Sequence, residues 1–162
     1  RRRFLKEIND SKKIPLRKRE ELFLHIKETC HYGIGMASHE EIDTLNIHHA
    51  TLLAMRRAWR SMIDDFDTVP TMALIDGKFT PELPCNAQAI TKGDSVSLSI
   101  AAASIMAKVT RDRIMARLHD EHPHYGWNSN AGYGTPEHMD GIKKFGVTSY
   151  HRKSFKPVRE AL

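Results

Sequence analysis

Two short apolar runs in this chain each end at a turn that carries an aspartate. The first run, TMALI, ends at Asp76 and Gly77, and the second, AITK, ends at Gly93 and Asp94. One of the most helix-favouring stretches of the chain, residues 97–118, follows directly. Strands that alternate with helices indicate an α/β fold, and both aspartates would then lie at the carboxyl edge of the sheet, where such folds build ligand sites.

The composition fits one domain and is compatible with a nucleic-acid partner. The chain has 162 residues, 40% of them hydrophobic, with 25 Lys and Arg against 20 Asp and Glu and a net charge of +5. Cys30 and Cys85 have no CxxC partner, which indicates reduced thiols, so we expect a cytoplasmic protein. Residues 98–109, the most apolar stretch, are too few to span a bilayer, and no signal peptide opens the chain, so we expect no membrane association.

The first half of the chain predicts two helices separated by a strand. Residues 9–11 are typical of a loop, and a helix begins at Pro15. The alternating, glycine-containing segment 31–38 indicates a strand. Ser38 and Glu41 have the spacing of a capping box, so a helix of roughly six turns follows. The core-facing residues expected on the two helices are Leu16, Leu22, Phe23, Ile26, Ile42, Leu45, His49, Leu52, Trp59 and Met62.

The second half predicts two strands, a long helix and a short helix. The strands cover residues 72–75 and a run that ends near Lys92, and the long helix covers residues 97–122. The short helix begins at Thr135 and Pro136 and ends at Gly146. We interpret residues 1–122 as a catalytic core and residues 123–162 as a helical segment with a substrate loop in the same domain. The residues expected to be buried on the long helix are Ile100, Ala103, Ala107, Ile114 and Leu118.

Asp76 and Asp94 are the first candidates for chemistry. Two carboxylates on adjacent strands would hold a hard cation such as Mg²⁺ or Mn²⁺, and these ions assist phosphoryl transfer. An alternative is that Asp76 only forms a turn and that Asp94 only starts the next helix. Histidines do not offer a competing zinc site, because the ten in the chain lack a second cluster or a cysteine pair at ligand spacing.

Two loops carry further candidate residues. Tyr133 lies between Gly132 and Gly134, which suits a ring that stacks on a sugar or a base, although it could instead pack on its own helix. Ser11 and Lys12 offer a hydroxyl and an ammonium group that could hold a phosphate oxygen, although the loop could equally be a solvated lead-in to the helix.

Seven sequence segments, spread over nearly the whole chain, can be considered together: NDSKK, NIHHATLLAMRRAW, ALIDG, ITKGDS, SIAAASIMAKVTRDR, GYGTPEH and HRKSF. In this order they closely resemble bacterial type 2 ribonuclease H, the ribonuclease HII family. The resemblance implies a ribonuclease H-like mixed sheet flanked by helices, with a C-terminal helical segment. It also implies an Mg²⁺- or Mn²⁺-dependent endonuclease that cuts the RNA strand of RNA–DNA hybrids, and duplex DNA at embedded ribonucleotides, to leave 5′-phosphates. We separately expect a monomer.

The resemblance also assigns roles by position. It implies that Asp76 is the third carboxylate of the family's metal site, bridging two ions, and that Asp94 is the fourth, binding one. Tyr133 matches the tyrosine that packs against the sugar at the junction, and Ser11 and Lys12 match a loop near the site.

One family segment has no match in this sequence. The family carries its first Asp and Glu in a D-E-x-G-R-G segment that would precede Arg1, and the Gly-Arg-Gly part reads the ribose 2′-hydroxyl. We therefore expect either an N-terminal stretch outside this sequence or a truncated form that lacks opening strands and does not cleave by itself. Two rival functions follow: a noncatalytic nucleic-acid-binding fragment, and a metal-dependent nuclease or phosphatase with another substrate.

Overall fold

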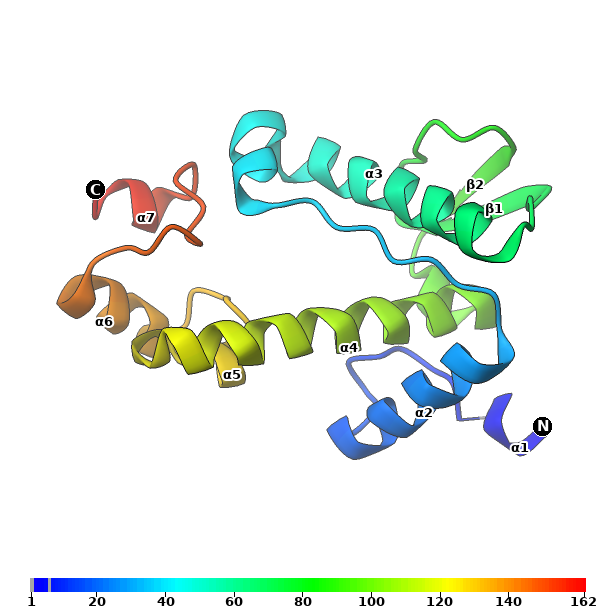
Figure 1. The fold of residues 1–162 in the computed structure, drawn as a ribbon, viewed down its shortest axis with the longest axis horizontal. Helices are drawn as coiled ribbons and strands as arrows, with labels where there is room; N and C mark the ends of the chain where they lie inside the picture. The colour runs from blue at the N-terminus through cyan, green and yellow to red at the C-terminus, as the bar shows by residue number, and fades with distance from the viewer. Residues whose placement is uncertain (1, 6) are drawn as a thin grey trace. The chain divides into compact units, whose positions relative to one another are not determined.

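The computed structural model describes residues 2–5 and 7–162, and these form two compact units (Figure 1). The first unit contains the chain up to Met36 together with Thr51–Val109, and the second contains Ala37–Ala50 and Thr110–Leu162. Two helices, α3 (His39–Phe66) and α4 (Leu98–Glu121), contribute residues to both units. No helix in the described part of the chain is both long and apolar enough to cross a membrane.

The first unit contains the sheet. It comprises α1 (Arg2–Leu5), α2 (Leu16–Thr29), β1 (Met72–Asp76), β2 (Asn86–Ile90) and the 3₁₀ turn η1 (Gly93–Ser95), with parts of α3 and α4. The strands are parallel and in register from Met72 opposite Asn86 to Asp76 opposite Ile90. Both predicted strands and the α/β class are confirmed, and in the described residues the sheet is this one parallel pair.

The core of the first unit lies between α2 and α4. Residues from both helices and from Ile14 form one apolar cluster, and the α2 members are Leu22, Phe23 and Ile26, as predicted. Leu16 was predicted to join them, but its side chain is 61% exposed because it is the first residue of the helix and precedes the packed turns.

The buried face of α4 differs from the predicted one. Ile100 is buried as expected, but Ala103 and Ala107 are exposed, and Ile114 and Leu118 are only half-buried. Burying an alanine methyl group removes little apolar surface from water. The larger side chains therefore determine which face of the helix is buried. In the first unit those residues are Ile105, Met106 and Val109.

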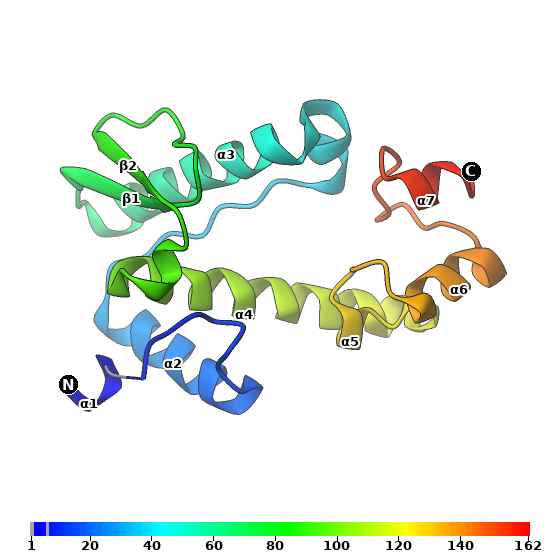
Figure 2. The ribbon, with the colours of Figure 1, turned by 180° about the vertical axis from the view of Figure 1, so that it is seen from behind.

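Residues 31–38 do not form the predicted strand. Residues 31–36 are extended but pair with no strand in the described chain, and they lie along α3 in both views (Figures 1 and 2). A Cβ atom on Gly33 would come within 2.0 Å of the Ala58 carbonyl oxygen, and one on Gly35 equally close to that of Ala54. The glycines therefore allow backbone to contact a helix, where the sequence pattern was interpreted as strand alternation.

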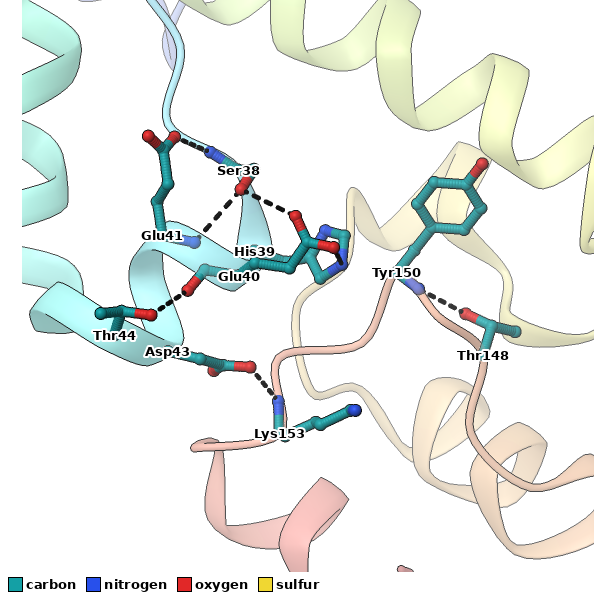
Figure 3. Close-up of polar contacts among 9 residues, drawn as sticks. All are labelled: Ser38, His39, Glu40, Glu41, Asp43, Thr44, Thr148, Tyr150 and Lys153. Atoms are coloured by element: carbon teal, nitrogen blue, oxygen red, sulfur yellow. Dashed lines mark hydrogen bonds and ion pairs between the residues drawn. The ribbon is translucent and has the colours of Figure 1, made fainter.

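The predicted capping box opens α3, but the helix is kinked. Ser38 N–H donates to Glu41 Oε2 at 2.9 Å, and Glu41 N–H donates to Ser38 Oγ at 3.1 Å (Figure 3). Asn46 has a φ of 67°, and its Oδ1 accepts the N–H groups of His48 and His49, which starts a second helical run. The kink breaks the predicted face: Leu45 and His49 are exposed, whereas Ile42, Leu52, Trp59 and Met62 are half-buried.

The second unit is helical. It contains the 3₁₀ turn η2 (Pro123–Tyr125), α5 (Trp127–Asn130), α6 (Pro136–Phe145) and α7 (Lys156–Arg159). The predicted bounds of α6 are confirmed, with Thr135 as N-cap and Gly146 as C-cap. The core residues of this unit are Met115, Tyr125, Trp127, Ile142 and Val158.

Candidate active site

The two predicted carboxylates follow the ends of the parallel strands. Asp76 is the last residue of β1 and lies opposite Ile90, the last residue of β2. The pairing continues for one more hydrogen bond, from Gly77 N–H to Ile90 O at 3.0 Å. Asp94 comes four residues after the end of β2, in η1, directly before α4. Both residues are thus at the carboxyl edge of the sheet, as the sequence predicted.

A hydrogen bond connects the two turns. Asp76 Oδ1 accepts the backbone N–H of Gly93, the residue before Asp94, at 2.8 Å. Gly93 is buried, and a Cβ atom there would come within 2.5 Å of Ile100 Cδ1 on α4. The preceding Lys92 adopts the left-handed conformation, with a φ of 56°. The absence of a side chain at Gly93 therefore lets the Asp94 turn approach Ile100 on α4, while the Gly93 N–H binds the Asp76 carboxylate.

The exposure of the two carboxylates suits a hard cation. Asp76 is exposed and Asp94 half-buried, and the only hydrogen bond found for Asp94 among the described residues is a long one, 3.4 Å from Ser95 Oγ. The other carboxylate oxygen of Asp76, Oδ2, has no hydrogen-bond partner among the described residues. Oxygen ligands without thiolate or imidazole fit Mg²⁺ or Mn²⁺. Within the described residues, no group of three or more His, Cys, Asp or Glu side chains could hold a metal ion. The candidate metal ligands are therefore the two carboxylates of Asp76 and Asp94.

Ser11 and Lys12 differ in exposure. Ser11 is 5% exposed, and its carbonyl accepts from Arg19 Nη1 at 2.8 Å, so this residue anchors the loop to α2. Lys12 is exposed, and its N–H donates to Asp10 Oδ1 at 3.0 Å. Of the two residues assigned to substrate by resemblance, only Lys12 presents its side chain to solvent.

Tyr133 lies in the second unit, in the loop between α5 and α6. Its side chain is 65% exposed, so it does not pack in the core. Its backbone is fixed: the N–H donates to Asn130 O at 2.9 Å, and the carbonyl accepts from Thr135 N–H at 2.8 Å. Ala131 and Gly132 precede it with φ values of 49° and 80°. The loop therefore holds an aromatic ring outward on an ordered backbone.

Asp43, which no sequence pattern indicated, joins α3 to the C-terminal HRKSF segment. Its carboxylate accepts the N–H group of Lys153 at 2.7 Å (Figure 3). It also accepts the N–H group of Ser154 at 2.9 Å and the Ser154 hydroxyl. Burial would raise the pKa of Asp43, but the hydrogen bonds from Ser154 and Lys153 outweigh it and hold the pKa below its usual range. The partners are more than a hundred residues apart in sequence, so no local pattern could reveal them.

Replacing Asp43 with Ala should destabilise the second unit by about 2 kcal/mol, because three donors lose a charged acceptor. The measurement is the free energy of unfolding in urea. Thr44→Ala is the matched control, since among the described residues the Thr44 hydroxyl donates only to Glu40 O in the same helix, and its loss should cost less than about 0.5 kcal/mol. Equal stability of the two variants would contradict a structural role for the Asp43 contacts.

Comparison with known proteins assigns this architecture to a family. A sequence model described as ribonuclease HII matches residues 3–158. The chain is 53% identical to ribonuclease HII of Magnetococcus marinus over 96% of its length and 72% of that protein. It is 50% identical to the Paramagnetospirillum magneticum enzyme, covering 96% and 76%.

Solved structures show the same fold. Ribonuclease H2 from Pyrococcus horikoshii superposes with a TM-score of 0.73 at 20% identity, covering 99% of this chain and 82% of that one. Ribonuclease HII from Archaeoglobus fulgidus, solved in a complex with PCNA, gives 0.68 at 23% identity, covering 94% and 81%. The relatives are nucleases by name, which does not favour a noncatalytic role, and the family depends on divalent metal ions. The chain belongs to the ribonuclease HII family, endonucleases that act on RNA–DNA hybrids.

Proposed function

We propose that this ribonuclease HII cuts the RNA strand of hybrids, and duplex DNA at embedded ribonucleotides, with Asp76 and Asp94 as ligands of Mg²⁺ or Mn²⁺. The observation that carries the proposal is the hydrogen bond from Gly93 N–H to Asp76 Oδ1, which ties the Asp94 turn to the end of β1. The bond orients one Asp76 oxygen and leaves the other for a cation. The arrangement supports a shared site for hard cations at the edge of the sheet.

The chemistry follows from charge at the phosphodiester. A water attacks phosphorus while negative charge builds on the nonbridging and leaving oxygens. Divalent cations held by Asp76 and Asp94 would supply the chemistry that activates that water and neutralises the leaving 3′ oxygen. Asp76 and Asp94 would both act as cation ligands, and neither carboxylate would be consumed. The Gly93 N–H keeps the Asp76 carboxylate in one orientation, so less reorganisation is needed when the ions bind.

Other residues of the chain would serve the nucleic acid. The exposed ring of Tyr133 offers a face for the sugar at the junction, and the exposed Lys12 ammonium can approach a phosphate. The buried Ser11 would anchor the loop that carries Lys12. The net charge of +5 favours a polyanion. We also propose a monomer that works in the cytoplasm, where the two free cysteines would remain reduced.

Cleavage of three matched substrates tests the proposal. The protein is incubated with Mg²⁺ and a duplex that is all DNA, DNA with a single ribonucleotide, or an RNA–DNA hybrid, all of one sequence. We expect cuts in the second and third substrates, ending in 5′-phosphates, no cut in the first, and none with a chelator. Cutting of the all-DNA duplex at the same rate would indicate a general nuclease. Salt-sensitive binding without any cutting would indicate a noncatalytic binder.

A further inference from the structure

A buried pair of histidines lies directly behind the Tyr133 loop. His138 on α6 is 6% exposed, and His151, at the start of the HRKSF segment, is 4% exposed. Their Nε2 atoms are 3.2 Å apart. The rings of Tyr125 and Trp127 enclose them, with the Tyr125 and His151 centroids 4.9 Å apart and those of Trp127 and His151 5.2 Å apart. Neither histidine has a role in the proposed chemistry at the carboxylates.

The hydrogen bonds determine which nitrogen of each ring carries the proton. His138 Nδ1 lies 2.9 Å from the carbonyl oxygen of Tyr133, which can only accept, so Nδ1 is the donor. His138 Nε2 accepts from Trp127 Nε1–H at 3.2 Å and is therefore unprotonated. His138 is thus neutral, with its proton directed at the substrate loop.

His151 completes the arrangement from the other side. Its Nδ1 accepts the backbone N–H of Thr148 at 2.9 Å, so its proton is on Nε2 and is directed at His138 Nε2, whose single lone pair it shares with Trp127 Nε1–H. The Thr148 hydroxyl contacts the same Nδ1 at 2.9 Å. Burial, and then the neighbouring His138, lower the pKa of His151 to about 4, which keeps the His151 ring neutral near neutral pH. His151 and Trp127 together hold His138 in the tautomer that donates to Tyr133.

We propose that His138 is a positioning residue for cleavage, acting through the Tyr133 carbonyl, and that His151 fixes its tautomer. The inference rests on the proposed contact between Tyr133 and the substrate sugar. The Tyr133 carbonyl already accepts from Thr135 N–H, so the His138 bond is a second restraint on the same peptide. Two hydrogen bonds to the same carbonyl limit rotation of the peptide and hence the direction of the Tyr133 Cα–Cβ bond, which carries the exposed ring.

Two substitutions of His138 separate this role from simple packing. In His138→Asn the side-chain amide nitrogen takes the place of Nδ1, so the bond to Tyr133 O is kept and the acceptor for Trp127 and His151 is lost. In His138→Gln the amide oxygen takes the place of Nε2, so the acceptor is kept and the bond to Tyr133 O is lost. On the single-ribonucleotide duplex, we expect kcat/KM to fall on the order of ten- to a hundredfold for His138→Gln and little for His138→Asn.

Tyr133→Ala provides the test of mechanism. In that background His138→Gln should cost no further activity, because the group it positions is absent. Equal losses in His138→Asn and His138→Gln, or an undiminished His138→Gln effect in the Tyr133→Ala background, would overturn the proposal. Thermal unfolding of each variant is measured alongside, so that a loss of fold is not counted as a loss of positioning.

Nuclear magnetic resonance gives a readout that does not depend on activity. Histidine ¹⁵N shifts of the unmodified protein should show the proton on Nδ1 of His138 and on Nε2 of His151, and the opposite tautomers would overturn the proposal. The Tyr133 amide should gain motion in His138→Gln and not in His138→Asn. If that motion appears but Tyr133→Ala cleaves normally, the positioning stands and the proposed substrate contact of Tyr133 fails.

Discussion

Changing Asp76 to Asn is expected to reduce cleavage on the order of a thousandfold while duplex binding and the fold are retained. The amide oxygen of Asn can still accept the Gly93 N–H, so the link between the two turns survives. What is lost is the negative charge that holds a divalent cation. The basic side chains that favour nucleic acid are untouched, so affinity for the duplex should change little. Single-turnover cleavage and equilibrium binding, both in Mg²⁺, measure the two effects separately.

Asp65→Asn is the matched control for this change. Asp65 is an exposed carboxylate on α3 in the same unit, and it accepts a surface hydrogen bond from the Ser61 hydroxyl at 3.2 Å. The control removes the same charge from the unit without touching the carboxyl edge of the sheet. Asp94→Asn should lose activity as Asp76→Asn does. Cleavage by Asp76→Asn at the rate of the Asp65→Asn control would remove Asp76 from the site.

The parts of the fold that were predictable depend on local sequence. β1 and β2 are apolar runs closed by turns, and their ends place Asp76 and Asp94 without any knowledge of tertiary contacts. The capping box at Ser38 and the caps of α6 are satisfied by residues within four positions of one another. Such signals act within one element, so one sequence is enough to read them.

The wrong predictions have a tertiary cause. The glycine-containing segment 31–38 was predicted to be a strand, but Gly33 and Gly35 allow backbone to lie against α3, a contact between elements. Asn46 tolerates a positive φ and caps a second helical run within α3. The apolar periodicity continues across this kink, so it gives no sign of the kink. On α4 the small Ala103 and Ala107 matched the period, but the larger neighbouring side chains determined the buried face.

In the candidate site, too, local features were predictable from the sequence and tertiary contacts were not. The carboxylates and Tyr133 stand out in sequence because glycines flank them. The groups that orient them, Gly93 N–H for Asp76 and His138 for Tyr133, are identified only by their hydrogen bonds. His138 lies in the recognised GYGTPEH segment, but its partner His151 is thirteen residues away in another segment. The chemistry was therefore predictable from the sequence, and the supporting contacts were not.

Acidification should destabilise this protein through His151 by roughly 3 kcal/mol between pH 7 and pH 4. Burial in the aromatic cage, and then His138, lower its pKa from 6.5 to about 4. Because the folded pKa lies below the unfolded one, the unfolded state binds the proton more readily. The stabilisation from keeping His151 neutral is complete above about pH 6.5 and is lost as the pH falls toward 4. Each unit of pKa difference corresponds to about 1.4 kcal/mol, which gives the expected size.

The comparison with His151→Asn isolates this contribution from that of the carboxylates, which titrate in an overlapping range. The Asn side-chain oxygen can take the place of Nδ1 and accept the Thr148 N–H, but the amide does not titrate. We expect the variant to be less stable than the unmodified protein at pH 7, because the bond to His138 Nε2 changes, and to lose less stability on acidification. The free energy of unfolding in urea, measured at half-unit pH intervals, gives both curves. Parallel curves from pH 7 to pH 4 would show that His151 is protonated as easily in the folded protein as in the unfolded chain, and that the buried pair is not held neutral.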